Sequence, residues 1–294
     1  DILWLKQSGR MTNRILFERE EQVAEGDFST IHLPEDDARN QHIIHVLGKS
    51  VGDTVKVGTI GGPLGEATVA EAPTKLEQPG ATGDGRDERL VRERQKHLRG
   101  HVVLHCHWEG EGDAATCLAV EPSPHRCHLL LALPRPKTLH RLYADLGAMG
   151  VDRVFLTGAT KVEKGYLTSH QVTDTAAVHR QLLKGVAQAA VDTLVPRVSV
   201  HRQLEPLLKS LPEILPAGTQ LLVADPAAPV RLLDAKPSGA DVLVAVGPEG
   251  GWTQEEVALL ISSGFQPVRV GSRILRTEQA VVTLLALVRE WACF

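Results

Sequence analysis

The chain has 294 residues, of which 43% are hydrophobic and 23% charged, as in an ordinary soluble globular protein. This length predicts one or two domains, and we favour two. The net charge of −4 argues against a surface that is positive all over, although it allows a local basic patch. No run approaches the roughly 18 apolar residues of a membrane helix. The first residues lack the layout of a signal peptide, so we expect a cytoplasmic or organellar location, not secretion.

The cysteine and histidine content does not predict a metal site. The four cysteines show none of the paired spacings of zinc sites. The runs His-Cys-His (105–107) and His-Arg-Cys-His (125–128) resemble ligand clusters, but neighbouring side chains on a strand point to opposite faces. We therefore expect buried thiols and ordinary histidines.

The front of the chain has the pattern of short strands and turns. Residues 53–57 and 66–70 alternate polar and apolar side chains, and Gly-Gly-Pro-Leu-Gly (61–65) lies between them. This arrangement predicts a β-hairpin within a small barrel or sheet. Strand-like runs return at 101–107 and 114–120.

An insertion at about 73–100 interrupts this first domain. Residues 73–85 are rich in Pro, Gly, Thr and Asp, which indicates a loop, and residues 86–99 carry mixed charges. The charged part fits either a solvated helix or a segment that contacts RNA. We place the first domain at 11–124 and the second at 125–294.

The second domain alternates strand-like and helix-like segments. This alternation predicts a parallel α/β sheet with helices on both faces, whose ligand lies beyond the carboxyl ends of the strands. The expected strands are 127–133, 151–156, 197–200, 220–224, 241–246 and 267–270. The expected helices are 137–149, 175–191, 253–263 and 277–291.

The first motif with chemical content is residues 242–253, a fully apolar strand followed by Gly-Pro-Glu-Gly-Gly-Trp-Thr. The glycines allow the backbone to approach a ligand, and the exposed amides could bind one. Thr253 and Glu256 fit a capping box that opens a helix. The turn is neither a phosphate-binding P-loop nor a Rossmann fingerprint, and glycines at such turns also occur for geometry alone.

The second motif is residues 268–280, in which a strand ends at Gly271 and a longer loop precedes an apolar helix. Thr277 is expected to cap that helix. Arg273 and Arg276 lie in the loop, where they are either surface arginines or contacts for a nucleic acid.

Together these two motifs resemble the signature of the bacterial 16S ribosomal RNA uridine-N3 methyltransferase family, which belongs to the SPOUT superfamily of trefoil-knotted methyltransferases. Residues 14–17, 42–47 and 51–53 also resemble parts of that family's PUA-like RNA-binding domain. The resemblance covers most of 11–72 and 125–294.

The resemblance implies an N-terminal PUA-like β-barrel domain, a knotted C-terminal domain that binds S-adenosylmethionine, an RNA substrate and a homodimer. It implies that the cofactor is held by Leu222, Val223, Gly247, Glu249, Gly250, Gly251, Val270, Ile274, Leu275 and Ala280.

The implied reaction transfers a methyl group to a base nitrogen, with uridine N3 as the expected acceptor. Removal of the N3 proton leaves charge on the neighbouring carbonyl oxygen, which an arginine could stabilise. Arg276 is the first candidate for this catalytic role. Arg273 is a weaker candidate and an expected RNA contact, and Arg14 is expected to bind an RNA phosphate.

Two segments depart from the family's pattern. Residues 144–150 retain only the last glycine of Gln-Lys-x-x-Glu-Leu-Gly. Residues 188–192 read Gln-Ala-Ala-Val-Asp where relatives carry Glu-Gln-Ser-Gly-Arg, so Asp192 stands in place of an arginine. These departures leave open a relative that binds RNA without catalysis. An unrelated α/β enzyme is a further alternative, because glycine turns occur in many folds.

Overall fold

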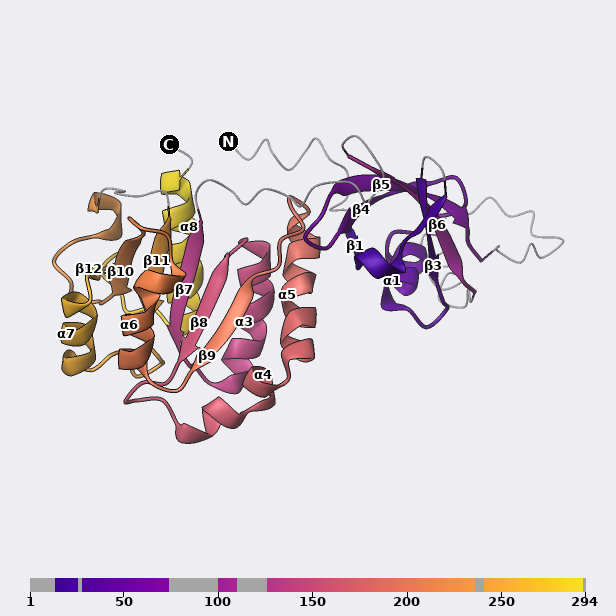
Figure 1. Ribbon diagram of the computed structural model, residues 1–294. Coiled ribbons are helices and arrows are strands. Elements are labelled where there is room, and N and C mark those ends of the chain that lie inside the picture. Colours follow the sequence, from indigo (N-terminus) through magenta and orange to yellow (C-terminus); the bar gives the residue numbers. More distant parts are fainter. Residues whose placement is uncertain (1–13, 26–27, 74–99, 110–125, 236–240, 293–294) are drawn as a thin grey trace, which may run out of the picture. The chain divides into compact units, whose positions relative to one another are not determined.

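The computed structural model describes residues 14–25, 28–73, 100–109, 126–235 and 241–292 (Figure 1). The chain divides into two compact units: Asp1–Val120 with Ala190–Thr193, and Glu121–Ala189 with Leu194–Phe294. The predicted boundary near residue 125, the strand predicted at 114–120 and almost all of the predicted insertion lie outside the described residues. None of the helices in the described ranges is long and apolar enough to cross a membrane.

Unit 1 contains one six-stranded sheet in the order β1-β4-β5-β6-β3-β2. Its strands are β1 (Ile15–Phe17), β2 (Val23–Glu25), β3 (Phe28–Leu33), β4 (Thr54–Thr59), β5 (Leu64–Glu71) and β6 (Val102–Trp108). β1 and β4 are parallel, whereas the other neighbours are antiparallel. The pairing of Thr54 with Thr68 confirms the predicted hairpin.

The core of unit 1 follows from the alternation of its strands and from a short helical segment. Helix η2 (His42–Val46), which directly follows α1 (Ala38–Gln41), supplies Ile43 and Ile44 to this core. On β6, Cys106 is buried and His107 is exposed, as the alternation predicted. Burial in apolar surroundings raises the pKa of Cys106 to about 12, so this thiol stays protonated.

Unit 2 is built on six parallel strands in the order β12-β10-β11-β7-β8-β9, which confirms the predicted parallel sheet. The strands are β7 (Cys127–Ala132), β8 (Arg153–Thr157), β9 (Arg197–His201), β10 (Gln220–Ala224), β11 (Val242–Val246) and β12 (Gln266–Val268). The central strands β7 and β11 are buried along their whole length, because helices cover both faces.

Two layers of helices sandwich this sheet (Figure 1). One face packs against α3 (Pro136–Ala148), α5 (Thr175–Ala189) and α8 (Thr277–Ala292), and the other against α6 (Leu204–Ile214) and α7 (Gln254–Ser262). The short helices η3 (Lys164–Thr168), α4 (His170–Thr173) and η4 (Leu232–Asp234) lie in the connections. Helix α6 was not predicted.

The first segment that departs from the family's pattern forms a close helix contact between α3 and α5. A Cβ built at Gly147 would collide with the backbone oxygen of Leu182, and one built at Gly185 would collide with that of Ala144. Small residues in 144–150 therefore allow the two helices to approach each other closely.

The second departing segment overlaps Ala190–Thr193, which packs with unit 1. Thr193 is completely buried, and its hydroxyl donates to the backbone oxygen of Gly62 at 2.7 Å. The N–H of Gly61 donates to the backbone oxygen of Thr193 at 2.9 Å. This segment therefore completes the packing of unit 1.

Candidate active site

A cavity of about 570 Å³ lies at the carboxyl end of the sheet in unit 2. Its wall consists of residues 224–227 after β10, 246–252 after β11, 268–275 at and after β12, and side chains of α7 and α8. These three strands lie side by side at one edge of the sheet. Parallel strands bring their carboxyl ends together, so loops far apart in sequence converge on one site.

The loop between β11 and α7 depends on glycine for its backbone geometry. A Cβ at Gly247 would lie 3.0 Å from the backbone nitrogen of Trp252. Gly251 has a φ of +67°, and its N–H donates to the backbone oxygen of Pro248 at 2.8 Å. The predicted capping box is present, because Thr253 and Glu256 each accept a backbone N–H from the other. The loop is thus held rigidly at the entrance of α7.

The loop between β12 and α8 also turns at a glycine, because Gly271 has a φ of +61°. Ile274 is 87% exposed, which is unusual for a large apolar side chain beside a cavity. The predicted cap of the last helix was wrong by one residue. Helix α8 begins at Thr277, and the residue before it, Arg276, accepts the N–H of Ala280 at 2.8 Å. The side-chain oxygen of Gln279 accepts the backbone N–H of Arg276 at 3.1 Å. The side chain that satisfies this N–H at the start of the helix is therefore that of Gln279 and not that of Thr277.

The structure brings together most of the residues expected to hold a cofactor. The residues that line the cavity are Gly247, Glu249, Gly250, Gly251, Val270, Ile274, Leu275 and Ala280. Leu222 and Val223 are fully buried inside β10 and are not part of the lining. The next two residues of the chain, Ala224 and Asp225, line the cavity instead.

Asp225 and Trp252 are lining residues that the sequence analysis missed. One carboxylate oxygen of Asp225 accepts the N–H of Ala227 at 2.9 Å, which holds the side chain at the end of β10. The indole Nε1 of Trp252 is buried and has no acceptor among the described residues. A polar residue directly after an apolar strand was the signal for Asp225.

The three arginines with predicted roles lie in different environments. Arg273 is exposed and lines the cavity. Arg276 is exposed at the start of α8 and is not part of the lining.

Arg14, in unit 1, is only 7% exposed. Its guanidinium donates to the backbone oxygens of Val57 at 2.6 Å, Gly65 at 3.3 Å and Ala190 at 3.3 Å. Contact with an RNA phosphate stays a prediction for Arg14, and its burial argues against it.

Contacts to neighbouring loops fix the position of the glycine turn. Lys161 donates to the backbone oxygens of Gly250 at 2.8 Å and Trp252 at 3.5 Å. The carboxylate of Glu256 accepts the N–H of Thr160 at 2.7 Å. Glu249 accepts the N–H of Arg135 at 2.9 Å. The loops after β7, β8 and β11 are therefore joined into one rigid wall, as a preformed binding site requires.

Comparisons with known proteins agree with this architecture. Residues 121–289 match the family described as the RNA methyltransferase domain. The chain is 30% identical over 278 residues to the ribosomal RNA small subunit methyltransferase E of Treponema pallidum, which covers 94% of this chain and 90% of that protein.

Two solved structures share the fold at lower identity. A ribosomal RNA small subunit methyltransferase E from Neisseria gonorrhoeae, bound to S-adenosyl methionine, is 17% identical with a TM-score of 0.66 over 95% of this chain and 97% of that one. A methyltransferase from Legionella pneumophila with bound SAM is 18% identical with a TM-score of 0.63 over 95% and 97%.

The fold and the loops at the carboxyl end of the sheet thus define an RNA methyltransferase domain. The chain belongs to the RNA methyltransferase family that includes the ribosomal RNA small subunit methyltransferase E proteins.

Proposed function

We propose that this chain transfers the methyl group of S-adenosylmethionine to a nucleotide of small-subunit ribosomal RNA. The observation that carries the proposal is the 570 Å³ cavity whose wall contains both glycine loops, in a chain of this methyltransferase family. Its volume is within the range of about 300–1,000 Å³ that is typical of small-molecule sites.

The residues of the cavity suit S-adenosylmethionine. Gly251 has open space where a side chain would stand, so a ligand can approach its backbone closely, and Gly247 lines the same cavity. Asp225 offers a carboxylate to ribose hydroxyls, in the way acidic residues after a strand bind ribose in other nucleotide sites. The unpaired Nε1 of Trp252 is a further donor. When bound, the cofactor supplies a methyl group already activated on a sulfonium centre, so the protein mainly has to align the acceptor.

The target nitrogen in this proposal is uridine N3. Arg276 stabilises the negative charge that develops on the neighbouring carbonyl oxygen, and Arg273 at the cavity binds the RNA. Both arginines belong to the loop between β12 and α8, one inside the lining and one just outside it. That position suits groups that act on a base presented to the cofactor.

The finer architecture is also part of the proposal: a SPOUT-type trefoil knot in unit 2, a PUA-like RNA-binding unit 1, and a homodimer. The family resemblance of the sequence motifs supports the first two, and the likeness to the Neisseria structure over 95% of the chain is a likeness of fold. For the homodimer, support comes from the family resemblance.

The residues that line the cavity do not favour the alternative of a non-catalytic relative. Its basis was the departure of residues 144–150 and 188–192 from the family's pattern. None of these residues lines the cavity. Residues 144–150 pack α3 against α5, and residues 190–192 belong to unit 1.

The test is methyl transfer from labelled S-adenosylmethionine to small-subunit ribosomal RNA, followed by digestion and mass analysis of the nucleosides. N3-methyluridine in wild type, and its absence with heat-denatured protein, is the expected result. A methylated nucleoside other than N3-methyluridine would correct the target. A folded protein that binds S-adenosylmethionine but methylates no RNA would contradict the proposed function.

A further inference from the structure

A second cavity of about 320 Å³ opens at the same end of the sheet, beyond strands β8 and β9. It lies between the segment 158–167, which runs from the end of β8 into η3, and the start of α6. The residues that line it are Gly158, Ala159, Thr160, Val162, Glu163, Lys164, Leu167, Arg202, Gln203, Leu204 and Glu256. None of the sequence motifs predicted this second cavity.

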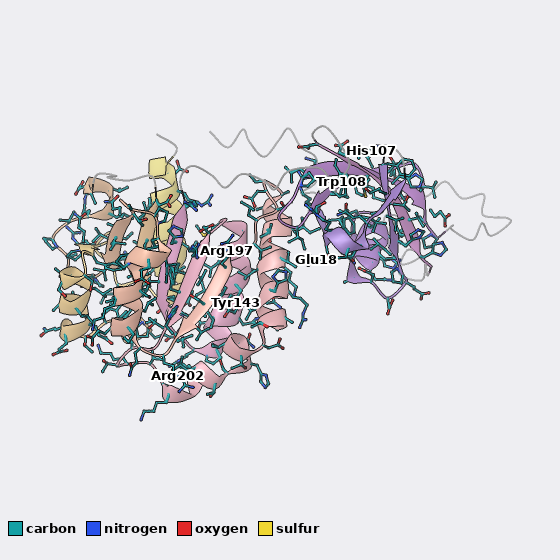
Figure 2. All side chains as sticks on the ribbon, viewed as in Figure 1. Glu18, His107, Trp108, Tyr143, Arg197 and Arg202 are labelled. Carbon is teal, nitrogen blue, oxygen red and sulfur yellow. The ribbon has the colours of Figure 1, made fainter. Side chains whose placement is uncertain are left out.

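The lining combines two exposed cations with acceptors and an apolar surface. Lys164 and Arg202 are both exposed, and Arg202 lies at the end of the sheet where β9 ends (Figure 2). Of the two acids, Glu256 accepts backbone N–H groups with both oxygens, and Glu163 accepts the hydroxyl of Tyr166 at 2.9 Å. The acids are therefore engaged with the protein, and the two cations face solvent.

Lys161 connects the walls of the two cavities. A Cβ at Gly250, in the wall of the first cavity, would lie 3.0 Å from Cδ of Lys161. The residue before Lys161, Thr160, lines the second cavity, and its N–H donates to Glu256. An RNA that presents one nucleotide to a cofactor in the first cavity therefore has the second cavity within reach of its neighbouring nucleotides.

Positively charged residues lie at the carboxyl end of the sheet beside both cavities. In the order of the strands, Arg273 follows β12, Arg135 follows β7, Lys161 and Lys164 follow β8, and Arg202 follows β9. Asp225 and Glu249 follow the two strands between β12 and β7, so the cations gather beyond β7, β8 and β9. Positive side chains clustered on one face are the usual footprint of a nucleic-acid backbone.

We propose that the second cavity binds a nucleotide of the RNA substrate next to the methylated one. Arg202 and Lys164 bind its phosphate, and the surface of Ala159, Val162 and Leu167 packs against its sugar and base. This inference rests on the proposed function and adds a subsite to it. A single phosphate ion would not use the apolar part of the lining, whereas a nucleotide uses both parts.

The test is the binding of an in vitro transcript of small-subunit ribosomal RNA at a series of salt concentrations. Each phosphate contact contributes a slope of about 0.7–0.9 to the dependence of log affinity on log salt. The double variant Lys164→Ala/Arg202→Ala should bind roughly tenfold more weakly at low salt, with a slope smaller by about 1.4–1.8. Calorimetry should give the same affinity for S-adenosylmethionine as in wild type.

The matched control is Lys209→Ala, an exposed lysine further along α6 that pairs with Glu205 and lies outside the cavity. It should keep the wild-type slope. An unchanged slope in the double variant would overturn the subsite while leaving the methyltransferase proposal intact. Wild type that binds S-adenosylmethionine but not RNA would overturn both.

A second variant separates a nucleotide from a phosphate alone. Ala159→Leu adds volume to the apolar lining and leaves both cations in place. It should weaken RNA binding at least fivefold without changing the salt slope. Unchanged affinity in Ala159→Leu would show that no base or sugar enters the cavity.

Discussion

The two ends of the parallel sheet in unit 2 use charged residues in opposite ways. At the amino end, His128 is completely buried, with Nδ1 3.5 Å from Asp152 and Nε2 3.7 Å from Asp241. Arg126 lies 3.2 Å from Asp241, and Arg153 lies 3.5 Å from Asp152. Arg126, His128 and Arg153 at this end therefore each lie beside a carboxylate.

At the carboxyl end the cations have backbone partners or face solvent. Lys161 donates to carbonyl groups of the glycine turn, and Arg202 and Arg273 are exposed at cavities. Positive charge remains available there for a ligand. The charged residues at the amino end therefore stabilise the fold, and those at the carboxyl end are available to bind a ligand, as expected for an open parallel sheet.

The largest expected effect is on catalysis at the carboxyl end. Arg276→Ala should lower the methylation rate by about 100-fold, because one donor to a developing oxyanion contributes roughly that much. Affinity for S-adenosylmethionine, measured by calorimetry, should change less than twofold, because Arg276 is outside the cavity lining. Arg153→Ala at the amino end is the control and should leave the rate unchanged. A wild-type rate in Arg276→Ala would remove this residue from the mechanism.

A second prediction concerns stability at the amino end. Asp241 is 6% exposed and accepts the N–H of Arg126 at 3.1 Å. Asp241→Ala removes this acceptor from a buried network and should lower the free energy of unfolding by about 2 kcal/mol. Urea unfolding measures this loss. Below the unfolding transition the variant should bind S-adenosylmethionine like wild type, and a large drop in affinity would contradict the separation of the two ends.

Two glycines with similar backbone geometry lie at opposite ends of the sheet in unit 2. Gly251 at the carboxyl end (φ +67°) and Gly218 at the amino end (φ +85°) both have positive φ and open space around the Cβ position. Alanine at either site should cost about 1–2 kcal/mol of stability through backbone strain. Gly251→Ala should also weaken S-adenosylmethionine binding roughly tenfold, about 1.4 kcal/mol. Equal affinities in the two variants would show that the turn at 247–251 does not bind the cofactor.

The smallest expected effect is a pH dependence at the amino end. Burial lowers the pKa of His128, although Asp152 and Asp241 oppose this shift. The unfolded state then binds the proton more readily, so stability is complete above the ordinary histidine pKa and falls as the pH decreases below it. Wild type should lose about 1 kcal/mol or less between pH 7 and pH 5 from this group. Urea unfolding of His128→Gln at both pH values should show a smaller loss, and an equal loss would assign the effect to other groups.

The sequence motifs predicted the first cavity because both of its main loops carry local signals. Glycine turns directly after apolar strands predicted the loops, and the family resemblance joined them into one site. The same pattern placed all the strands of unit 2 within a few residues of their observed bounds. Strand β10 was predicted at its observed bounds, Gln220–Ala224, because it is a short apolar run between turns.

Features that depend on tertiary contacts could not be predicted. Arg14 carries no local sign of burial, and its acceptors on Val57 and Gly65 lie 43 and 51 residues away. The second cavity joins the segments that follow β8 and β9 with Leu204 of α6 and Glu256 of α7, and only the order of the strands brings these residues together.

Helix α6 was missed for a local reason. It contains Pro206 in its first turn and Pro212 near its end, and both resemble signals for a loop. Leucines at 204, 207, 208 and 211 nevertheless form one buried face. Pro206 is tolerated because N–H groups in the first turn have no acceptor within the helix, so the missing N–H of proline breaks no hydrogen bond. Tertiary packing of that face outweighs the low helix propensity of proline.

The most direct test of the account is hydrogen exchange of the purified protein with and without S-adenosylmethionine, read peptide by peptide. Ligand binding at the carboxyl end should slow exchange in peptides that cover 224–227, 247–253 and 268–280. Peptides at the amino end, around 126–128, 152–153 and 241–242, should exchange as before. Protection confined to the amino end, or no protection in any peptide at saturating cofactor, would contradict the assignment of binding to the carboxyl end of the sheet.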